Sequence, residues 1–146
     1  MDGVELRLPP DVAYVGLARL VVTVAARSAG LPGERIEDLK IAVSEAVANA
    51  IKSHLRHAVA APIRLTFGTP NPGFFSVSVT DAGGGFDPAP AEDNGTRSWA
   101  AESGLGVTLI RGMADAVDFR RDEGMVVQMR FSLTHNGIDA LKPPAT

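Results

Sequence analysis

Hydrophobic and polar residues alternate along several short stretches of the chain and repeat at helical spacing along longer ones. Alternation bounded by turn residues predicts strands. The predicted strands are 4–8, 62–67, 74–80, 117–121 and 126–133. The predicted helices run from about 11 to 28, from about 33 to 57 and from 104 to 114. This order predicts an α+β fold, a two-layer α/β sandwich with a mostly antiparallel sheet and helices on one face.

Length and composition indicate a single domain. The chain has 146 residues, of which 45% are hydrophobic and 21% charged, with a formal net charge of −3 and no Cys. We assign the domain to residues 1–134 and expect 135–146 to form a flexible C-terminal tail. The charge predicts no nucleic-acid partner. The lack of a leader pattern or a long unbroken apolar stretch predicts a cytoplasmic protein with no membrane partner.

The long predicted helix 33–57 carries two polar residues beside its apolar stripe. Four residues at helical spacing form the stripe: Leu39, Val43, Ala46 and Ala50. Glu45 and Asn49 are four residues apart, so they lie together on one face of the helix. An amide oxygen suits Mg²⁺, and a carboxylate one turn away can take a proton from a nucleophile. The pair indicates a metal-assisted site, with an ordinary solvated helix face as the alternative.

The predicted strand 74–80 runs directly into Asp81 and a glycine-rich turn. A carboxylate at the end of a buried strand can accept a hydrogen bond from the exocyclic amino group of adenine, whereas guanine has a carbonyl there. Gly83 and Gly85 permit positive φ and let a ligand approach the backbone closely. The alternative is an ordinary turn in which Asp81 is the turn former.

Two further glycines, Gly104 and Gly106, open the predicted helix 104–114. Backbone N–H groups at a helix start attract phosphate. No Lys-Ser/Thr pair follows, so this is not a Walker loop, and the glycines are not part of a β-α-β unit. The preceding stretch 87–102 is rich in Pro, Ala, Asp and Gly without periodicity, which predicts a mobile loop.

The order and spacing of these residues resemble those of a known family. Glu45…Asn49, Asp81-x-Gly83-x-Gly85 and Gly104-x-Gly106 look like the N, G1 and G2 boxes of the histidine-kinase-like (Bergerat) ATPases. Residues 38–51 and 103–110 are similar to the bacterial anti-sigma-factor serine kinases (RsbW-like). The similarity covers about residues 4–133, so it implies a Bergerat ATP-binding fold for the domain 1–134.

The resemblance implies an ATP-dependent anti-sigma factor and serine/threonine kinase that phosphorylates an anti-anti-sigma partner. Glu45 is then the base for the partner's hydroxyl, Asn49 holds Mg²⁺ against the triphosphate, and Asp81 binds the adenine amino group. The other nucleotide-binding residues that the resemblance implies are Gly83, Gly85, Ser103, Gly104, Leu105, Gly106 and Thr108. Residues 87–102 become the ATP lid.

The resemblance also implies protein partners. In this family the clients are a sigma factor and an anti-anti-sigma protein, and the first long helix contributes to the dimer and sigma-binding face. A homodimer is therefore expected. Arg19 on that helix sits at the matching place for a partner contact, with a plain solvated helix residue as the alternative.

Two departures from the family bear on catalysis. Glu102 stands where relatives often carry an Arg, and Arg97 and Arg111 are alternatives for that charge. Gly124-Met125-Val126 lacks the hydroxyl that often supports the adenine-binding Asp. A second function therefore stays open: an ATP-binding anti-sigma or switch module with little or no kinase activity. A more distant option is a catalytic subunit serving a separate phosphotransfer protein.

The histidines make a third departure. His54 and His57 come later in the chain than the His usually found soon after the Asn in closer relatives. We interpret both as surface helix residues, because no pair of them is held near an acidic ligand.

Overall fold

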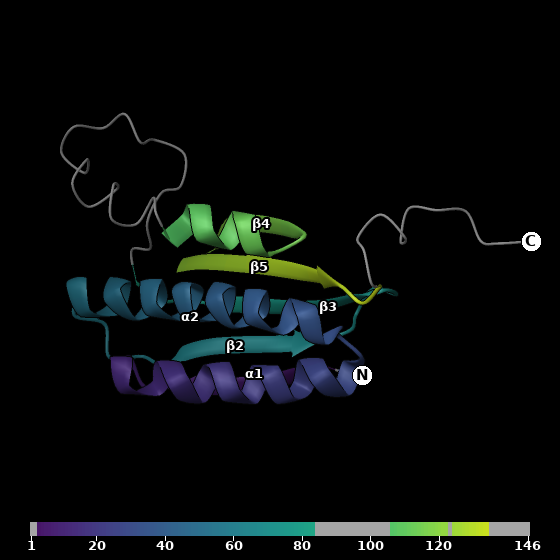
Figure 1. The fold of residues 1–146 in the computed structure, drawn as a ribbon. Coiled ribbons are helices and arrows are strands. Elements are labelled where there is room, and N and C mark those ends of the chain that lie inside the picture. Colours follow the sequence, from purple (N-terminus) through teal and green to yellow (C-terminus); the bar gives the residue numbers. More distant parts are fainter. Residues whose placement is uncertain (1–2, 84–105, 123, 135–146) are drawn as a thin grey trace, which may run out of the picture.

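The computed structural model describes residues 3–83, 106–122 and 124–134 (Figure 1). Five strands form one sheet in the order β1-β2-β3-β5-β4, and every neighbouring pair is antiparallel. The strands are β1 (Val4–Leu8), β2 (Ile63–Gly68), β3 (Phe74–Thr80), β4 (Ala116–Asp122) and β5 (Gly124–Ser132). The predicted α+β sandwich is confirmed. The predicted lid 87–102 and tail 135–146 lie outside the described residues.

Two long helices, α1 (Val15–Ala29) and α2 (Gly33–Arg56), lie side by side along one face of the sheet (Figure 1). A 3-10 turn, η1 (Val12–Tyr14), precedes α1, and residues 106–113 form a further helix. Asp11 caps η1 rather than a long helix, because its side chain accepts the Ala13 N–H at 2.9 Å. Gly30 ends α1 with a φ of 97°, a left-handed conformation that favours glycine.

Side-chain alternation along the strands directs one face of the sheet toward the helices. In β2, Ile63 and Leu65 are fully buried, whereas Arg64 and Thr66 are exposed. The predicted core stripe of α2 is confirmed, because all four of its residues are buried: Leu39, Val43, Ala46 and Ala50. Full burial of a large apolar side chain contributes roughly 1.5–3 kcal/mol before the entropy of ordering is subtracted. The helices are therefore anchored firmly enough to position polar groups at their flanks.

The register of β3 and β5 brings two distant segments together at one end of the sheet. Thr80 is paired with Val126, so Asp81 follows β3 at the end where β5 begins with Gly124. The Asp81 N–H donates to Met125 O at 3.0 Å, which extends the ladder by one residue. The chain after β3 and the start of β5 therefore form one structural unit.

The sequence predicted no apolar segment long enough to span a membrane, but one helical stretch meets that criterion. Among the described residues, Val12–Ala29 is long and apolar enough to cross a membrane, with a mean hydropathy of 1.4. A core helix or an N-terminal signal sequence meets the same criterion of length and composition, and 22% of this window is buried. One face of α1 is in fact buried in the core, through Ala18, Val22 and Ala26.

Candidate functional site

Two side chains of α2 meet the start of the helix formed by residues 106–113, here called the site helix. A Cβ placed on Gly106 would lie 3.1 Å from Glu45 Oε2 and 3.1 Å from Asn49 Nδ2. Both distances are tighter than ordinary van der Waals contact, so a side chain at this position would press on the two polar groups. The structure therefore brings together three of the residues that the sequence singled out.

The side-chain amide of Asn49 has a donor that is unsatisfied within the described part of the chain. Its Nδ2 atom is buried and has no hydrogen-bond partner among the described residues. A buried donor without a partner costs roughly 1–3 kcal/mol. A ligand with acceptor oxygens would satisfy this donor and leave the carboxamide oxygen for a cation. Mg²⁺ fits such a site, because it keeps several waters and takes few protein oxygens.

Asp81 is a buried carboxylate, and the segment that follows it packs against the last turns of α2. Asp81 is 6% exposed, and its Oδ1 accepts the Gly83 N–H at 3.1 Å and the Met125 N–H at 3.5 Å. Burial raises the pKa of Asp81 above its ordinary value of 3.8, and the hydrogen bond from Met125 opposes that rise. The backbone of Met125 thus stabilises the carboxylate at the position where relatives were expected to use a hydroxyl.

Asp81→Asn should make the ligand-free protein more stable at neutral pH. The variant keeps an acceptor for the two N–H groups but removes the buried charge. Because the folded-state pKa is raised, wild type loses stability as the pH rises from about 4 through that pKa, whereas the variant does not. The melting temperature of the variant should exceed that of wild type at pH 7, by about 2–4 °C per kcal/mol. Thermal unfolding between pH 4 and 8 checks this, and a gap that does not narrow toward pH 4 would contradict it.

Two glycines are close-packed at the Asp81 segment, Gly83 against α2 and Gly124 against Asp81 itself, and neither has a positive φ. A Cβ on Gly83 would lie 2.7 Å from Ser53 Oγ, and one on Gly124 would lie 1.8 Å from Asp81 O. Gly83 does not have the positive φ that the sequence suggested; it is close-packed against the last turns of α2 instead. The close contact of Gly124 with Asp81 could not be predicted from the sequence, because it depends on how β5 pairs with β3.

His54 is not a surface residue, so that interpretation was wrong. Its side chain is fully buried, Nε2 accepts the Ala82 N–H at 2.8 Å, and Nδ1 lies 2.9 Å from Ala61 O. Since Nε2 accepts, Nδ1 carries the proton and donates to the carbonyl. His57 is exposed, as predicted. His54 continues the buried face of α2 three residues beyond Ile51, and this helical spacing is the signal that could have revealed it.

The remaining predicted residues divide between the described part of the chain and the part outside it. Thr108 is exposed on the first turn of the site helix. The Arg111 guanidinium lies over the Phe119 ring, 4.9 Å from its centroid. The other residues tied to the phosphate loop lie outside the described residues: Gly85, Arg97, Glu102, Ser103, Gly104 and Leu105.

Arg19 lies beside Glu45 in a groove between α1 and α2. Its Nη1 donates to Ser44 Oγ at 3.4 Å, and Ser44 directly precedes Glu45 in the chain. The groove has a volume of about 430 Å³ and is lined by Arg19, Glu37, Lys40, Ile41, Ser44 and Glu45. Glu45 therefore borders this groove on the α2 side.

Comparison with known proteins identifies the family. Residues 8–131 match the family described as "Histidine kinase-like ATPase domain", and the chain belongs to that family. The serine-protein kinase RsbW of Staphylococcus epidermidis is 34% identical over 136 residues, covering 88% of this chain and 85% of the relative. The serine-protein kinase RsbW of Bacillus subtilis is 31% identical over 145 residues, covering 94% and 90%. Within the family the chain is thus an RsbW-like sequence, as the motifs indicated.

Solved structures support the same fold. The RsbU and RsbW domains of Rv1364c from Mycobacterium tuberculosis superpose with a TM-score of 0.67 at 15% identity, covering 90% of this chain and 32% of that one. This chain therefore spans about a third of that structure's length. The histidine kinase domain of a blue-light-activated kinase from Erythrobacter litoralis gives a TM-score of 0.56 at 19% identity, covering 86% and 61%. At these identities the likeness shows the fold alone.

Proposed function

We propose that this chain is an ATP- and Mg²⁺-dependent serine/threonine kinase that binds a sigma factor and phosphorylates an anti-anti-sigma protein. One observation carries the proposal. Glu45, Asn49 and Gly106 meet at one point, and the buried Asn49 amide has no partner among the described residues. Membership of an ATPase family with serine-protein kinase relatives supports the same chemistry. A sigma-factor regulator acts in the cytoplasm, so we place the protein there.

The two ends of the nucleotide would be held by different parts of the chain. Asn49 would hold Mg²⁺ through its carboxamide oxygen, and backbone N–H groups at the start of the site helix would face the phosphates. Asp81 would accept a hydrogen bond from the amino group of adenine. Guanine has a carbonyl at that position and cannot donate this bond. When bound, ATP supplies the phosphoryl group and Mg²⁺ offsets its negative charge. The chain's own residues therefore select the base and orient the reacting end.

Glu45 would take the proton of the partner's hydroxyl. Its carboxylate lies one helical turn from Asn49, so a base and a metal ligand flank the same space. The groove beside it opens toward Arg19 on α1. A partner segment that lies in this groove would bring a Ser or Thr hydroxyl to Glu45 and contact Arg19.

The exposed face of α1 would serve dimerisation and sigma-factor binding. Leu17, Leu20 and Val24 are 44%, 60% and 57% exposed, although all three are apolar. They occur at helical spacing and so lie along one side of α1. An apolar stripe of this kind is typical of a surface that binds another protein.

A binding module without phosphoryl transfer is the second candidate function. One observation favours it: the positions after Gly124 carry Met125 and Val126, so this segment supports the Asp81 carboxylate through the Met125 N–H at 3.5 Å and not through a hydroxyl, and the nearer donor is the Gly83 N–H at 3.1 Å. A weaker hold on Asp81 would lower nucleotide occupancy rather than change the fold. Such a module would bind the sigma factor but leave the anti-anti-sigma protein unmodified.

Asn49→Ala should lower the affinity for ATP in the presence of Mg²⁺ by at least about tenfold, because it removes the oxygen proposed to hold the cation. Without Mg²⁺ the variant and wild type should bind ATP with similar, weak affinity. Titration calorimetry with and without Mg²⁺ measures both quantities.

Lys52→Ala is the matched control, because Lys52 is exposed on α2 one turn after Asn49. It should bind Mg-ATP as wild type does. If Asn49→Ala kept the full response to Mg²⁺, the assigned metal ligand would be wrong. If wild type bound no ATP at all, the proposed pocket would be wrong.

A further inference from the structure

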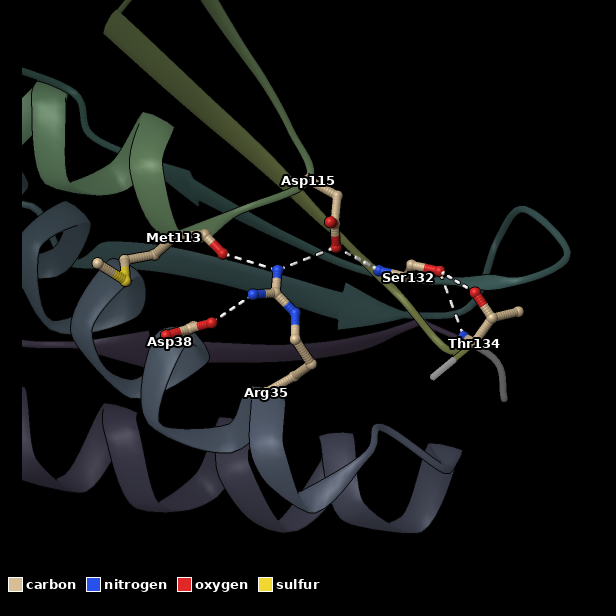
Figure 2. Close-up of polar contacts among 6 residues, drawn as sticks. All are labelled: Arg35, Asp38, Met113, Asp115, Ser132 and Thr134. Carbon is tan, nitrogen blue, oxygen red and sulfur yellow. Dashed lines mark hydrogen bonds and ion pairs between the residues drawn. The ribbon is translucent and has the colours of Figure 1, made fainter. Parts of the chain in front are cut away.

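A polar cluster joins the first turn of α2 to the far end of the site helix (Figure 2). The Arg35 guanidinium donates through Nη2 to Met113 O at 2.8 Å and pairs with Asp115 Oδ2 at 3.1 Å. Its Nη1 pairs with Asp38, three residues along α2. We call these four residues the Arg35 cluster. Neither the motifs nor the proposed function accounts for it.

The Arg35 side chain is largely buried at the centre of the cluster, and its carboxylate partners lie partly exposed around it. The Arg35 side chain is 23% exposed, and both carboxylates that face it are about a third exposed or less. The Asp115 oxygen bound by Arg35 also accepts the Ser132 N–H at 2.7 Å, at the end of β5 (Figure 2). Half-buried ion pairs are screened less than exposed ones. The cluster therefore links α2, the site helix and β5.

Both ends of the site helix contact α2. Gly106, at its start, faces Glu45 and Asn49, while Met113, at its end, is bound by Arg35. Arg35 precedes Glu45 by about 15 Å along α2, and the site helix spans about 12 Å at the same rise per residue. The site helix thus runs antiparallel to α2 and is held by it at both ends.

Arg35 lies at the C-terminal end of the site helix, where a positive charge is favourable. The last carbonyl groups of a helix have no partner within it, and they form the negative end of its dipole. A cation that donates to one of these carbonyl groups, as Arg35 does to Met113 O, supplies the missing hydrogen bond and offsets the negative end of the dipole. Within the described residues of the site helix, Ile110 is the one fully buried apolar side chain. Met113 also packs against the core, and the Arg35 contact adds a directional hold at this end of the helix.

We propose that Arg35 is a positioning residue for the phosphate end of the nucleotide. By holding the Met113 end of the site helix, it sets where Gly106 lies against Glu45 and Asn49. A helix of this length moves as a rigid unit, so releasing one end displaces the other. The adenine end does not depend on Arg35, because His54 and Met125 hold the Asp81 segment. This inference rests on the proposed function for its ligand.

The test compares Mg-ATP with adenosine, which lacks the phosphates. Arg35→Met keeps the apolar stem but removes the guanidinium. The variant should bind Mg-ATP at least about tenfold more weakly than wild type, with adenosine affinity changed less than about twofold. Arg35→Lys should recover part of the loss, because an ammonium can reach one acceptor but not bridge several. Competition titration against a fluorescent nucleotide measures both affinities for wild type and for each variant.

Arg120→Met is the matched control, because Arg120 pairs with Asp118 in an exposed ion pair on β4. It should leave both affinities unchanged. An equal loss of Mg-ATP and adenosine affinity in Arg35→Met, or no loss of either, would overturn the positioning role. A merely structural role would lower stability and both affinities together.

Hydrogen–deuterium exchange on the nucleotide-free protein separates this inference from the proposed function. Arg35→Met, or Asp115→Asn if that variant does not fold, should exchange faster than wild type in residues 106–113 and unchanged in β2 and β3. Unchanged exchange in 106–113 would overturn the inference. Failure of wild type to bind Mg-ATP would instead contradict the proposed function, and faster exchange would still show that Arg35 holds the site helix.

Discussion

Replacing Glu45 by Gln should lower the rate of phosphoryl transfer to the partner by about 10²–10⁴-fold, the contribution typical of a positioned general base. Gln has nearly the same size and keeps a hydrogen-bonding oxygen, but it cannot take the proton of a hydroxyl. Glu45 lies against Gly106 without supporting the core. The fold, the affinity for Mg-ATP and the affinity for the sigma factor should therefore be kept. Single-turnover transfer from labelled ATP to the anti-anti-sigma protein measures the rate.

Glu34→Gln is the control for this substitution, since Glu34 is an exposed carboxylate in the first turn of the same helix. Its transfer rate should stay within about twofold of wild type. A Glu45→Gln protein that transfers phosphate at the wild-type rate would remove Glu45 from the reaction. A variant that also loses Mg-ATP binding would indicate that Glu45 holds the nucleotide rather than the proton.

Gly124→Ala should damage the Asp81 segment severely. The added Cβ would lie 1.8 Å from Asp81 O and 2.8 Å from Asp81 C, and neither backbone atom can rotate away. Either β5 or the segment after β3 must shift, and the hydrogen bond between Asp81 N–H and Met125 O must lengthen. We expect the free energy of unfolding to fall by about 1–3 kcal/mol or more. Chemical denaturation and ATP titration measure the two losses.

Gly112→Ala tests whether the loss in Gly124→Ala comes from that overlap rather than from any change of glycine. Gly112 is an exposed residue of the site helix with no atom within 4 Å of an added Cβ. Alanine there should leave stability unchanged or raise it by up to about 1 kcal/mol. If Gly124→Ala were as stable as this control and bound ATP normally, the close contact between β5 and Asp81 would be wrong.

Local patterns predicted the parts of the fold that depend on nearest neighbours. The alternation in β2 and the stripe of α2 depend on side-chain periodicity, and both elements lie where the sequence placed them. The pairing of Glu45 with Asn49 follows from helix geometry alone. The strand that ends at Asp81 was likewise visible in the alternation before it.

Contacts between distant segments could not be predicted in this way. Gly124 lies against Asp81 because of the β3–β5 register, and no local signal reports that pairing. Arg35 and Asp115 are 80 residues apart and meet only after the site helix packs on α2. His54 is different, because it continues the helical spacing of the buried face of α2 past Ile51, and that spacing is visible in the sequence.

The most direct test of the account is the chemical identity of the phosphorylated residue. Wild type and Glu45→Gln would each be incubated with Mg-ATP and candidate anti-anti-sigma proteins, and the products examined by mass spectrometry. The account predicts acid-stable phosphoserine or phosphothreonine on the partner, formed by wild type and lost in Glu45→Gln, with no phosphate retained on His54 or His57. Tight sigma-factor binding by both proteins, with no phosphate transferred to any partner, would contradict the kinase and establish the binding module.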